Sequence, residues 1–294
     1  MRNLVYLFAI AFLISACERK AIVIQTDFGT KDGAVAAMKG VAYSVDKNLQ
    51  LFDLTHEIPA YNVWEAAYRL NQATSFWPAG TVFVSVVDPG VGTQRKSIVL
   101  QTRSGHYFIS PDNGTLTLVA ESLGIKAVRE IDEARNRRKQ SDRSYTFHGR
   151  DVYIYTAARL ASGKISFKEV GPELADSIFM IPYQKAVFEN GVLKGNIPVL
   201  DIQFGNVWTN IPDSLVQKAG LQFGDSITVE IFHDTASKFR DRVPLVKTFG
   251  EVTEGNTLAY FNSLLNFSLA INMRSFADSF HIGSGAKWTI HVSE

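Results

Sequence analysis

Apolar runs and helical periodicities alternate along the first part of the chain. Residues 21–26, 49–54 and 81–87 form short, nearly continuous apolar runs, which are typical of strands buried on both faces. Between them, residues 33–45 and 62–76 carry apolar side chains at helical spacing. This order predicts parallel strands joined by right-handed helical crossovers.

Further elements of the same kind follow up to residue 160. A hairpin is predicted at 97–101 with 107–110, helices at 115–123 and 151–160, and a strand at 126–131. Ligands of open α/β sheets bind beyond the carboxyl ends of the strands. Asp27, His56 and Asp88 all fall at such ends, so we expect the site there.

The pattern changes between residues 171 and 191, where proline, glycine and asparagine interrupt it. Short alternating segments follow, at 192–202, 226–231, 257–260 and 287–292. The sequence therefore predicts an α/β protein. A mostly parallel-sheet α/β domain over 21–184 would precede a smaller, mostly β, barrel-like domain over 185–294.

Composition narrows the function classes. The 294 residues are 46% hydrophobic, with 30 Lys+Arg against 29 Asp+Glu, which excludes a disordered chain and gives no reason to expect nucleic acid. The single cysteine excludes an internal disulfide framework and a Cys-rich zinc site. Five basic residues between 135 and 143 are flanked by acidic ones, which favours a solvated loop over an anion-binding patch.

The N-terminus has the order of a bacterial lipoprotein signal. Arg2 precedes an apolar run of eleven residues, 4–14, and Ile-Ser-Ala-Cys follows. This order predicts a signal peptide over 1–16, a lipid-modified Cys17 and a short tether over 17–20. The protein would then be an exported lipoprotein held to a membrane only through its lipid, on the periplasmic or cell-surface side. The alternative is a buried element with an incidental cysteine.

The segment 27–33 (DFGTKDG) joins the first strand to the first helix. Asp27 at the strand end could hold two hydroxyls of a ribose, as acidic residues do in dinucleotide folds. Asp32 could bind a ligand or cap the helix, and Phe28 could simply pack in the core.

Two further motifs carry charged groups at loop positions. Asp88 follows the third strand, and Arg95 lies seven residues on; the alternative is a turn aspartate with a surface arginine. His148 precedes a glycine and a helix start, although an isolated histidine is usually structural. A two-metal hydrolase site made with Asp27, His56 and Asp151 is a further possibility, but no HExxH or HxHxD spacing supports it, so we predict no metal.

Two segments of the second domain mix aromatic and amide side chains. Residues 201–210 (DIQFGNVWTN) combine rings for stacking with polar groups for edge hydrogen bonds, as a flat heterocycle requires; core aromatics around a turn are the alternative. Residues 261–272 form a second stretch rich in Asn and Ser.

Taken in order, these motifs resemble the S-adenosylmethionine (SAM) hydroxide adenosyltransferase family, relatives of the SAM-dependent fluorinase and chlorinase. The resemblance covers about 22–292. It implies a SAM site between the two domains, completed by neighbouring subunits of a homotrimer. Asp88, Arg95 and His148 fall on the Asp-Arg-His set of the water-using members. The predicted substrate-binding residues are Asp27, Phe28, Asp32, Asp201, Phe204, Asn206, Trp208, Ser263 and Asn272. Leu264 stands where some relatives have an arginine for the methionine carboxylate.

The implied reaction is attack of water or hydroxide on the ribose 5′ carbon of SAM, which yields adenosine and methionine. SAM is the substrate, and no cofactor is expected. Halide-using relatives carry an uncharged residue at Asp88 and a serine at Gly149, so we expect hydrolysis; which of Asp88 and His148 takes the proton stays open. A SAM-dependent halogenase and a non-catalytic nucleoside-binding lipoprotein are the alternatives. Export conflicts with the cytoplasmic origin of SAM.

Overall fold

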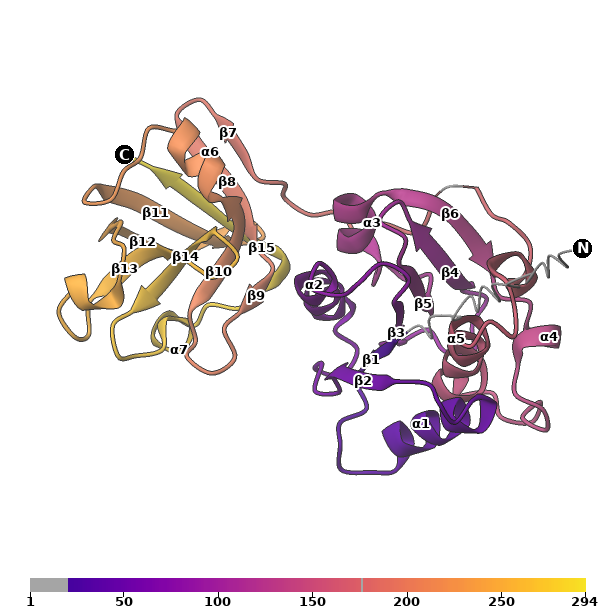
Figure 1. Ribbon diagram of the computed structural model, residues 1–294. Helices are drawn as coiled ribbons and strands as arrows, with labels where there is room; N and C mark the ends of the chain where they lie inside the picture. Colours follow the sequence, from indigo (N-terminus) through magenta and orange to yellow (C-terminus); the bar gives the residue numbers. More distant parts are fainter. Residues whose placement is uncertain (1–20, 176) are drawn as a thin grey trace, which may run out of the picture.

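The computed structural model describes residues 21–175 and 177–294. The predicted signal peptide over 1–16 and tether over 17–20, with Cys17, lie outside these residues. Figure 1 shows two lobes joined by one extended segment. We call residues 21–170 the N-terminal lobe and residues 187–294 the C-terminal lobe.

One six-stranded sheet organises the N-terminal lobe, in the order β2-β1-β3-β5-β4-β6. The strands are β1 (Ile22–Thr26), β2 (Leu51–Thr55), β3 (Val82–Val86), β4 (Ser97–Thr102), β5 (Tyr107–Pro111) and β6 (Ile125–Glu130). The pairs β1–β2, β1–β3 and β3–β5 are parallel, whereas β4 runs antiparallel to both of its neighbours. The predicted parallel crossovers and the predicted hairpin are both confirmed.

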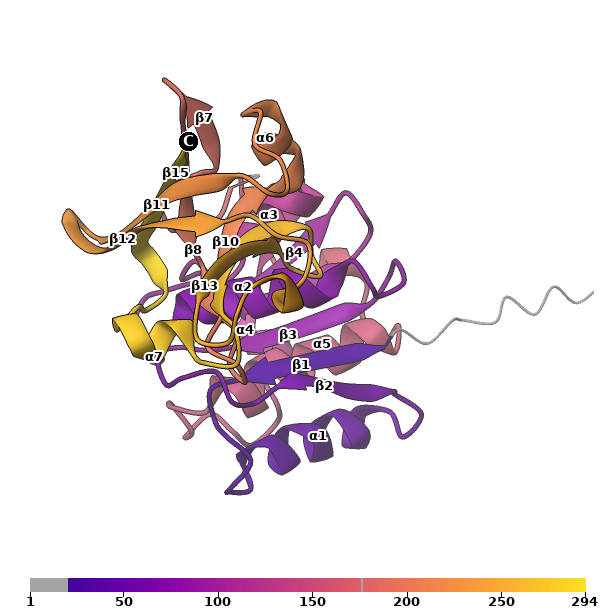
Figure 2. The same cartoon turned by 90° about the vertical axis from the view of Figure 1, so that its left-hand side faces the viewer.

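Helices cover both faces of this sheet. They are α1 (Ala34–Val45), α2 (Val63–Thr74), α3 (Thr117–Leu123), α4 (Glu133–Asn136) and α5 (Ile154–Ala161). Alternate strand residues face opposite sides: Ile22 and Ile24 pack with α1 and α5, whereas Val23 packs with α2 and α3. Figure 2 shows α1 and α2 on opposite sides of β1, β2 and β3. Strands β1 and β3 are buried along their whole length, which explains their continuous apolar runs. The prediction that the strand around 49–54 is also buried on both faces is wrong, because β2 lies at the edge of the sheet and is partly exposed.

The C-terminal lobe consists of two antiparallel sheets, in the orders β13-β14-β10-β9 and β12-β11-β15-β8-β7. Its strands are β7 (Val187–Glu189), β8 (Val192–Ile197), β9 (Val199–Leu200), β10 (Val207–Pro212), β11 (Ser226–His233), β12 (Ala236–Pro244), β13 (Thr257–Phe261), β14 (Asn266–Ile271) and β15 (Gly285–Ser293). Two short helices accompany them, α6 (Asp213–Lys218) and α7 (Phe276–Phe280). The α/β fold with a second β lobe is confirmed, and the predicted barrel-like character takes the form of these two sheets.

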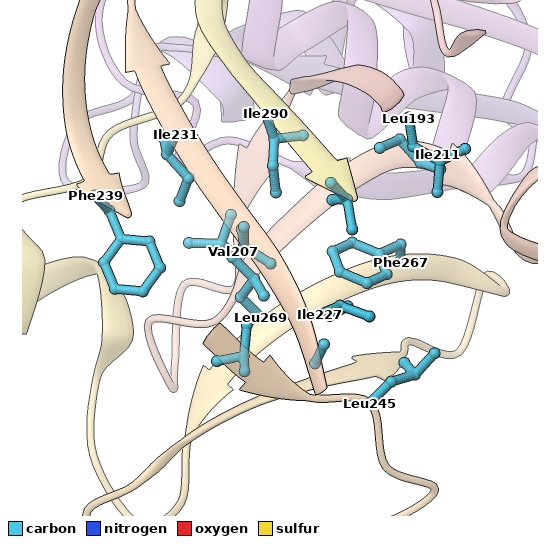
Figure 3. Packing of buried hydrophobic residues seen from close by; sticks show 14 of the residues in the cluster. Leu193, Val207, Ile211, Ile227, Ile231, Phe239, Leu245, Phe267, Leu269 and Ile290 are labelled. Atoms are coloured by element: carbon cyan, nitrogen blue, oxygen red, sulfur yellow. The ribbon is translucent and has the colours of Figure 1, made fainter. Parts of the chain in front are cut away.

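Alternating apolar side chains from both sheets form the core of the C-terminal lobe. Val207 and Phe267 from one sheet meet Ile231 and Ile290 from the other, and all four are fully buried (Figure 3). Because successive strand residues face opposite sides, only every second position needs to be apolar. This explains the alternating pattern of the sequence after residue 191.

Helix α2 of the N-terminal lobe contacts the C-terminal lobe around β9. The Trp64 indole Nε1 donates to the Pro198 carbonyl oxygen at 3.2 Å, and the Arg69 guanidinium donates to the Leu200 carbonyl oxygen at 3.3 Å. The Trp64 ring also packs on Tyr183 in the connecting segment, with ring centroids 4.8 Å apart. These contacts fix where the start of the C-terminal lobe meets the N-terminal lobe. The domain boundary between residues 184 and 185 stays a prediction.

We expect Phe267→Ala to lower the free energy of unfolding by about 3–5 kcal/mol, because it opens a cavity in a fully buried core. Phe223, which is 47% exposed, offers a matched control: Phe223→Ala removes the same atoms where solvent already reaches. Urea unfolding followed by circular dichroism measures both variants. Equal losses would contradict the assignment of the core to Phe267.

Candidate active site

Asp88 and Arg95 form a buried ion pair just beyond the carboxyl end of β3. The Asp88 carboxylate accepts hydrogen bonds from Arg95 Nε at 2.9 Å and from Nη2 at 2.5 Å. Only 6% of the Asp88 side chain and 12% of the Arg95 side chain are exposed. Burial is the largest influence on Arg95 and opposes its charge, but the hydrogen bonds to Asp88, together with the charge interactions with Tyr153, Asp88 and Glu133, outweigh it and raise the pKa of Arg95. A fixed cation therefore faces the carboxylate from one side.

A hydroxyl pair extends from this ion pair. Arg95 Nη1 donates to Ser97 Oγ at 3.0 Å, and Ser97 Oγ lies 3.2 Å from the Tyr153 hydroxyl. The Arg95 guanidinium also lies over the Tyr153 ring, 5.7 Å from its centroid. Burial raises the pKa of Tyr153, so this hydroxyl keeps its proton. The pair therefore holds the guanidinium in one orientation.

His148 immediately precedes a π-helical turn (Gly149–Tyr153), where the sequence predicts only the start of a helix. Its Nε2 lies 3.1 Å from Arg137 Nη2, and that same nitrogen of Arg137 donates to Glu133 Oε2 at 2.6 Å. His148 Nδ1 is buried and has no hydrogen-bond partner within the described part of the chain. One ring nitrogen is thus engaged by protein and the other is not.

Several charges act on the His148 imidazole. Burial is the largest influence and lowers its pKa, and the cations Arg95 and Arg137 lower it further. The carboxylates of Glu133 and Asp88 act in the opposite direction without reversing the shift. His148 is therefore neutral at neutral pH.

Asp27 lies at the end of β1 and meets the loop that follows β2. Its Oδ2 accepts a hydrogen bond at 3.0 Å from the backbone nitrogen of Tyr61, a residue with a left-handed φ of 68°. The Phe28 ring packs edge-to-face on Phe147, with centroids 5.8 Å apart. Asp27, Phe28, Asp88 and His148 all line one cavity of about 260 Å³. The structure therefore brings together four predicted residues from three separate segments.

Gly149 forms part of the wall of this small cavity. A Cβ at this position would lie 3.2 Å from Val86 Cγ1 and 3.3 Å from Phe28 Cε2, which is tighter than ordinary contact. A serine here would have to displace one of these side chains. The wall is shaped for a residue without a side chain.

A second cavity, of about 1040 Å³, lies chiefly on the C-terminal lobe. Asp201, Phe204, Asn206 and Asn272 line it, as does Tyr260, which the sequence analysis missed. Phe204 is 65% exposed, so its ring is free to stack on a ligand. The loop over 57–61 separates the two cavities, since its first residues line the large one and its last residues the small one.

Three predicted substrate-binding residues line neither cavity. Asp32 is exposed, and its Oδ1 accepts a hydrogen bond from the Ala34 nitrogen at 2.8 Å, although the N-cap position of α1 is Gly33 and not Asp32. Ser263 is exposed in the turn between β13 and β14, and Trp208 lies within β10. Whether a side chain faces a cavity depends on the local backbone geometry. The order of motifs along the chain does not reveal this.

The basic loop contributes to the site, contrary to the prediction that it is only solvated. Arg137 reaches His148 and Glu133, and Arg138 pairs with the fully buried Asp151 at 3.0 Å. The signal in the sequence was the spacing of four between Glu133 and Arg137, which places the two side chains on one helix face. Glu133 does not only neutralise the charge of the loop, because it also orients Arg137 toward His148.

His56 does not belong to the cavity lining. Its Nδ1 lies 2.9 Å from Thr26 Oγ1, and its Nε2 lies 3.0 Å from Asp53 Oδ1. This buried histidine instead ties the end of β1 to the end of β2. Among residues 21–175 and 177–294, no group of three or more His, Cys, Asp or Glu side chains is placed to hold a metal ion.

The geometry defines a ligand site at the carboxyl edge of an α/β sheet, with a second, aromatic and polar cavity on the β lobe. Residues 22–171 match the N-terminal domain of SAM hydroxide adenosyltransferase, and residues 195–289 match its C-terminal domain. The chain therefore belongs to the SAM hydroxide adenosyltransferase family.

Three relatives illustrate the match. The chain is 35% identical to (R)-S-adenosyl-L-methionine hydrolase of Methanocaldococcus jannaschii, over 87% of this chain and 86% of that protein. It is 29% identical to a fluorinase of Actinopolyspora mzabensis, over 91% and 96% of the two chains. The crystal structure of an uncharacterized conserved protein from Thermotoga maritima superposes with a TM-score of 0.82 at 34% identity, covering 93% of this chain and all (100%) of that one.

The prediction of an exported, membrane-anchored lipoprotein with a signal peptide is wrong by this comparison. The relatives that match along most of the chain are named as SAM hydrolases and a fluorinase, and these names carry no lipoprotein or membrane designation. The prediction rested on the order of residues in one short segment, which lies outside the described residues. Within the described residues, no helix is long and apolar enough to cross a membrane.

We expect the His148 imidazole to titrate with a midpoint below about 6.5, because burial and two cations disfavour its charged form. The unfolded chain takes up this proton more readily. The contribution of His148 to stability is therefore complete above about pH 6.5 and is lost as the pH falls through its folded pKa. NMR titration of the histidine Cε1–H signals, assigned with His148→Gln, measures the midpoint. A midpoint at or above 6.5 would contradict the described environment.

Proposed function

We propose that this protein hydrolyses SAM to adenosine and L-methionine by attack of water or hydroxide on the ribose 5′ carbon. The observation that carries the proposal is the single cavity shared by Asp27, Asp88 and His148, with Arg95 behind Asp88. Membership of the family and relatives named SAM hydrolase support it.

Each end of the substrate has a matching set of side chains. Asp27 holds the ribose hydroxyls, because a carboxylate at a strand end accepts from two hydroxyls at once. Its bond from the Tyr61 nitrogen fixes the carboxylate for this purpose. Phe204 and Asn206 of the large cavity suit a purine, through stacking and edge hydrogen bonds, and Asp201 suits the ammonium of the methionine part.

The chemical step needs alignment more than acid catalysis. The C5′–S bond breaks with its electron pair going to sulfur, and methionine leaves as a neutral thioether that needs no proton. Asp88 and His148 orient the water against C5′, and partial burial keeps bulk solvent out. The side chains orient the water, and the sulfonium of the substrate supplies the leaving group. We therefore propose no cofactor.

Water is favoured over halide for two physical reasons. The Asp88 carboxylate repels an anion, and a halide would first have to lose its hydration to enter the cavity. The serine of halide-using relatives would also crowd Val86 and Phe28 at Gly149, so that these side chains would have to shift by a few tenths of an ångström.

The sulfonium configuration adds a finer proposal. The matching hydrolases of Methanocaldococcus jannaschii, Salinispora tropica and Thermus thermophilus are all named for the (R) form of SAM. We therefore propose (R)-SAM as a substrate, and assays should supply both sulfonium epimers separately.

Liquid chromatography of reactions with each epimer, with and without chloride or fluoride, tests the activity. We expect adenosine and methionine in equal amounts and no 5′-halo-adenosine. Asp88→Asn and His148→Ala should each lower kcat/KM by ten-fold or more, as expected for loss of a polar catalytic group.

Two exposed residues supply matched controls. Asp142→Asn and His233→Ala make the same chemical changes away from both cavities and should leave turnover near normal. Circular dichroism must show that the Asp88 and His148 variants remain folded. Near-normal rates in both of these variants would contradict the assigned roles, and wild-type protein that consumes neither epimer would contradict the function.

We also propose that the chain forms a homotrimer in which a neighbouring subunit completes each site. Within one chain, the catalytic and aromatic residues line two different cavities on either side of the 57–61 loop. Ile202, Phe204 and Met273 around the large cavity are 78%, 65% and 79% exposed, and such a patch marks an interaction surface.

Mixing two inactive variants tests the shared site. Asp88→Asn damages the N-terminal lobe and Asn206→Ala the C-terminal lobe, so a trimer reassembled from a 1:1 mixture should regain about a quarter of the wild-type sites. Light scattering after size exclusion gives the oligomeric state, and chromatography gives the activity. A trimer that regains no activity would place each complete site within one chain.

A further inference from the structure

The interaction of Arg137 with His148 bears on how the histidine acts. A guanidinium only donates hydrogen bonds, so His148 Nε2, 3.1 Å from Arg137 Nη2, has to be the accepting nitrogen. A neutral imidazole carries one proton, which then resides on Nδ1. Nδ1 is the buried nitrogen that has no partner among the described residues.

Glu133 holds Arg137 in this orientation. Its Oε2 accepts from Arg137 Nη2 at 2.6 Å and lies 3.7 Å from His148 Nε2. Its Oε1 accepts from Ser97 Oγ at 3.4 Å, which links it to the hydroxyl pair beside Arg95. The Arg137 side chain is 18% exposed, so its donor is directed by a partly desolvated carboxylate rather than by water.

We propose that Arg137 and Glu133 are positioning residues that fix His148 as the Nδ1–H tautomer, so that neither ring nitrogen of His148 is free to take the proton of the attacking water. This inference deepens the proposed function and rests on it. It also resolves the choice between Asp88 and His148 as proton acceptor, because an Nδ1 that carries a proton cannot accept another.

In this reaction the oxygen of water replaces the sulfur of methionine on C5′. The oxygen of water forms its bond to C5′ while the C5′–S bond breaks, with its electron pair going to sulfur. The water proton passes to the Asp88 carboxylate, which keeps lone pairs free beside its two bonds from Arg95, and from there to solvent. His148 takes no proton in this step, because its accepting nitrogen is engaged by Arg137 and its other nitrogen already carries a proton.

The charges around His148 set the expected response to pH. Those facing it are Glu133, Arg95, Arg137 and Asp88, together with the buried phenol of Tyr153. Removal of the Arg137 cation should raise the pKa of His148, and removal of the Glu133 anion should lower it. The acid limb of kcat/KM should therefore move in opposite directions in Arg137→Met and Glu133→Gln.

Ring ¹⁵N NMR of the full chain labelled in histidine reads the tautomer directly, without SAM. Above its pKa, we expect wild-type His148 to be protonated on Nδ1. Arg137→Met should shift the proton toward Nε2 and lower kcat ten-fold or more with a smaller change in KM, because Arg137 lines neither cavity. Arg137→Lys, which keeps a donor, should restore part of both.

Arg135→Met is the matched control. Arg135 lies in α4, two residues before Arg137, its side chain is 76% exposed, and it pairs with Asp132 rather than with His148. This variant loses the same charge and should leave the tautomer, the acid limb and turnover unchanged. If Arg137→Met does not fold, the wild-type spectrum and the Glu133→Gln profile decide the question.

Wild-type His148 protonated on Nε2 would overturn this inference, as would an Arg137→Met variant with an unchanged tautomer and acid limb. The proposed function fails separately, through wild-type protein that does not consume SAM. The NMR result does not depend on that activity, so the two failures are distinguishable.

Discussion

A buried carboxylate is stable only beside a fixed cation, and the pair of Asp88 with Arg95 meets that requirement at the end of β3. Loss of either partner would leave an uncompensated charge, which typically costs about 3–5 kcal/mol in a buried pair. The surrounding groups depend on this pair: Ser97 and Tyr153 hold the guanidinium, and Glu133 connects Ser97 to the loop that carries Arg137. The ion pair of Asp88 with Arg95 therefore stabilises the segment after β3 and also presents the Asp88 carboxylate to the small cavity.

The sheet explains why residues distant in sequence meet at this point. Strands β1 and β3 are parallel neighbours, so Asp27 and Asp88 leave the sheet at the same edge. The Tyr61 nitrogen then reaches Asp27 from the loop after β2, and His148 enters from the π-helical turn. The crevice is therefore built from four segments, each of which adjoins a strand or helix of the N-terminal lobe.

Much of the fold was predictable because continuous apolar runs and helical spacing are local signals. The strands around Ile22 and Val82, and the helix with its buried Met38, required only the periodicity of burial. The exposed position of Asp32 outside both cavities and the contact of Arg137 with His148 were not predictable to the same degree. Each depends on a backbone or side-chain orientation that a motif does not contain.

The sequence by itself determined the alternation of elements, the ordered motifs and hence the family. It also placed Asp88, Arg95 and His148 together as a candidate set. Only the tertiary structure decided which neighbours these groups have: a buried ion pair for Asp88, and a donor from Arg137 for one nitrogen of His148. The physical reason is that periodicity reports burial along one element, whereas hydrogen-bond direction and charge depend on groups that long-range packing brings together.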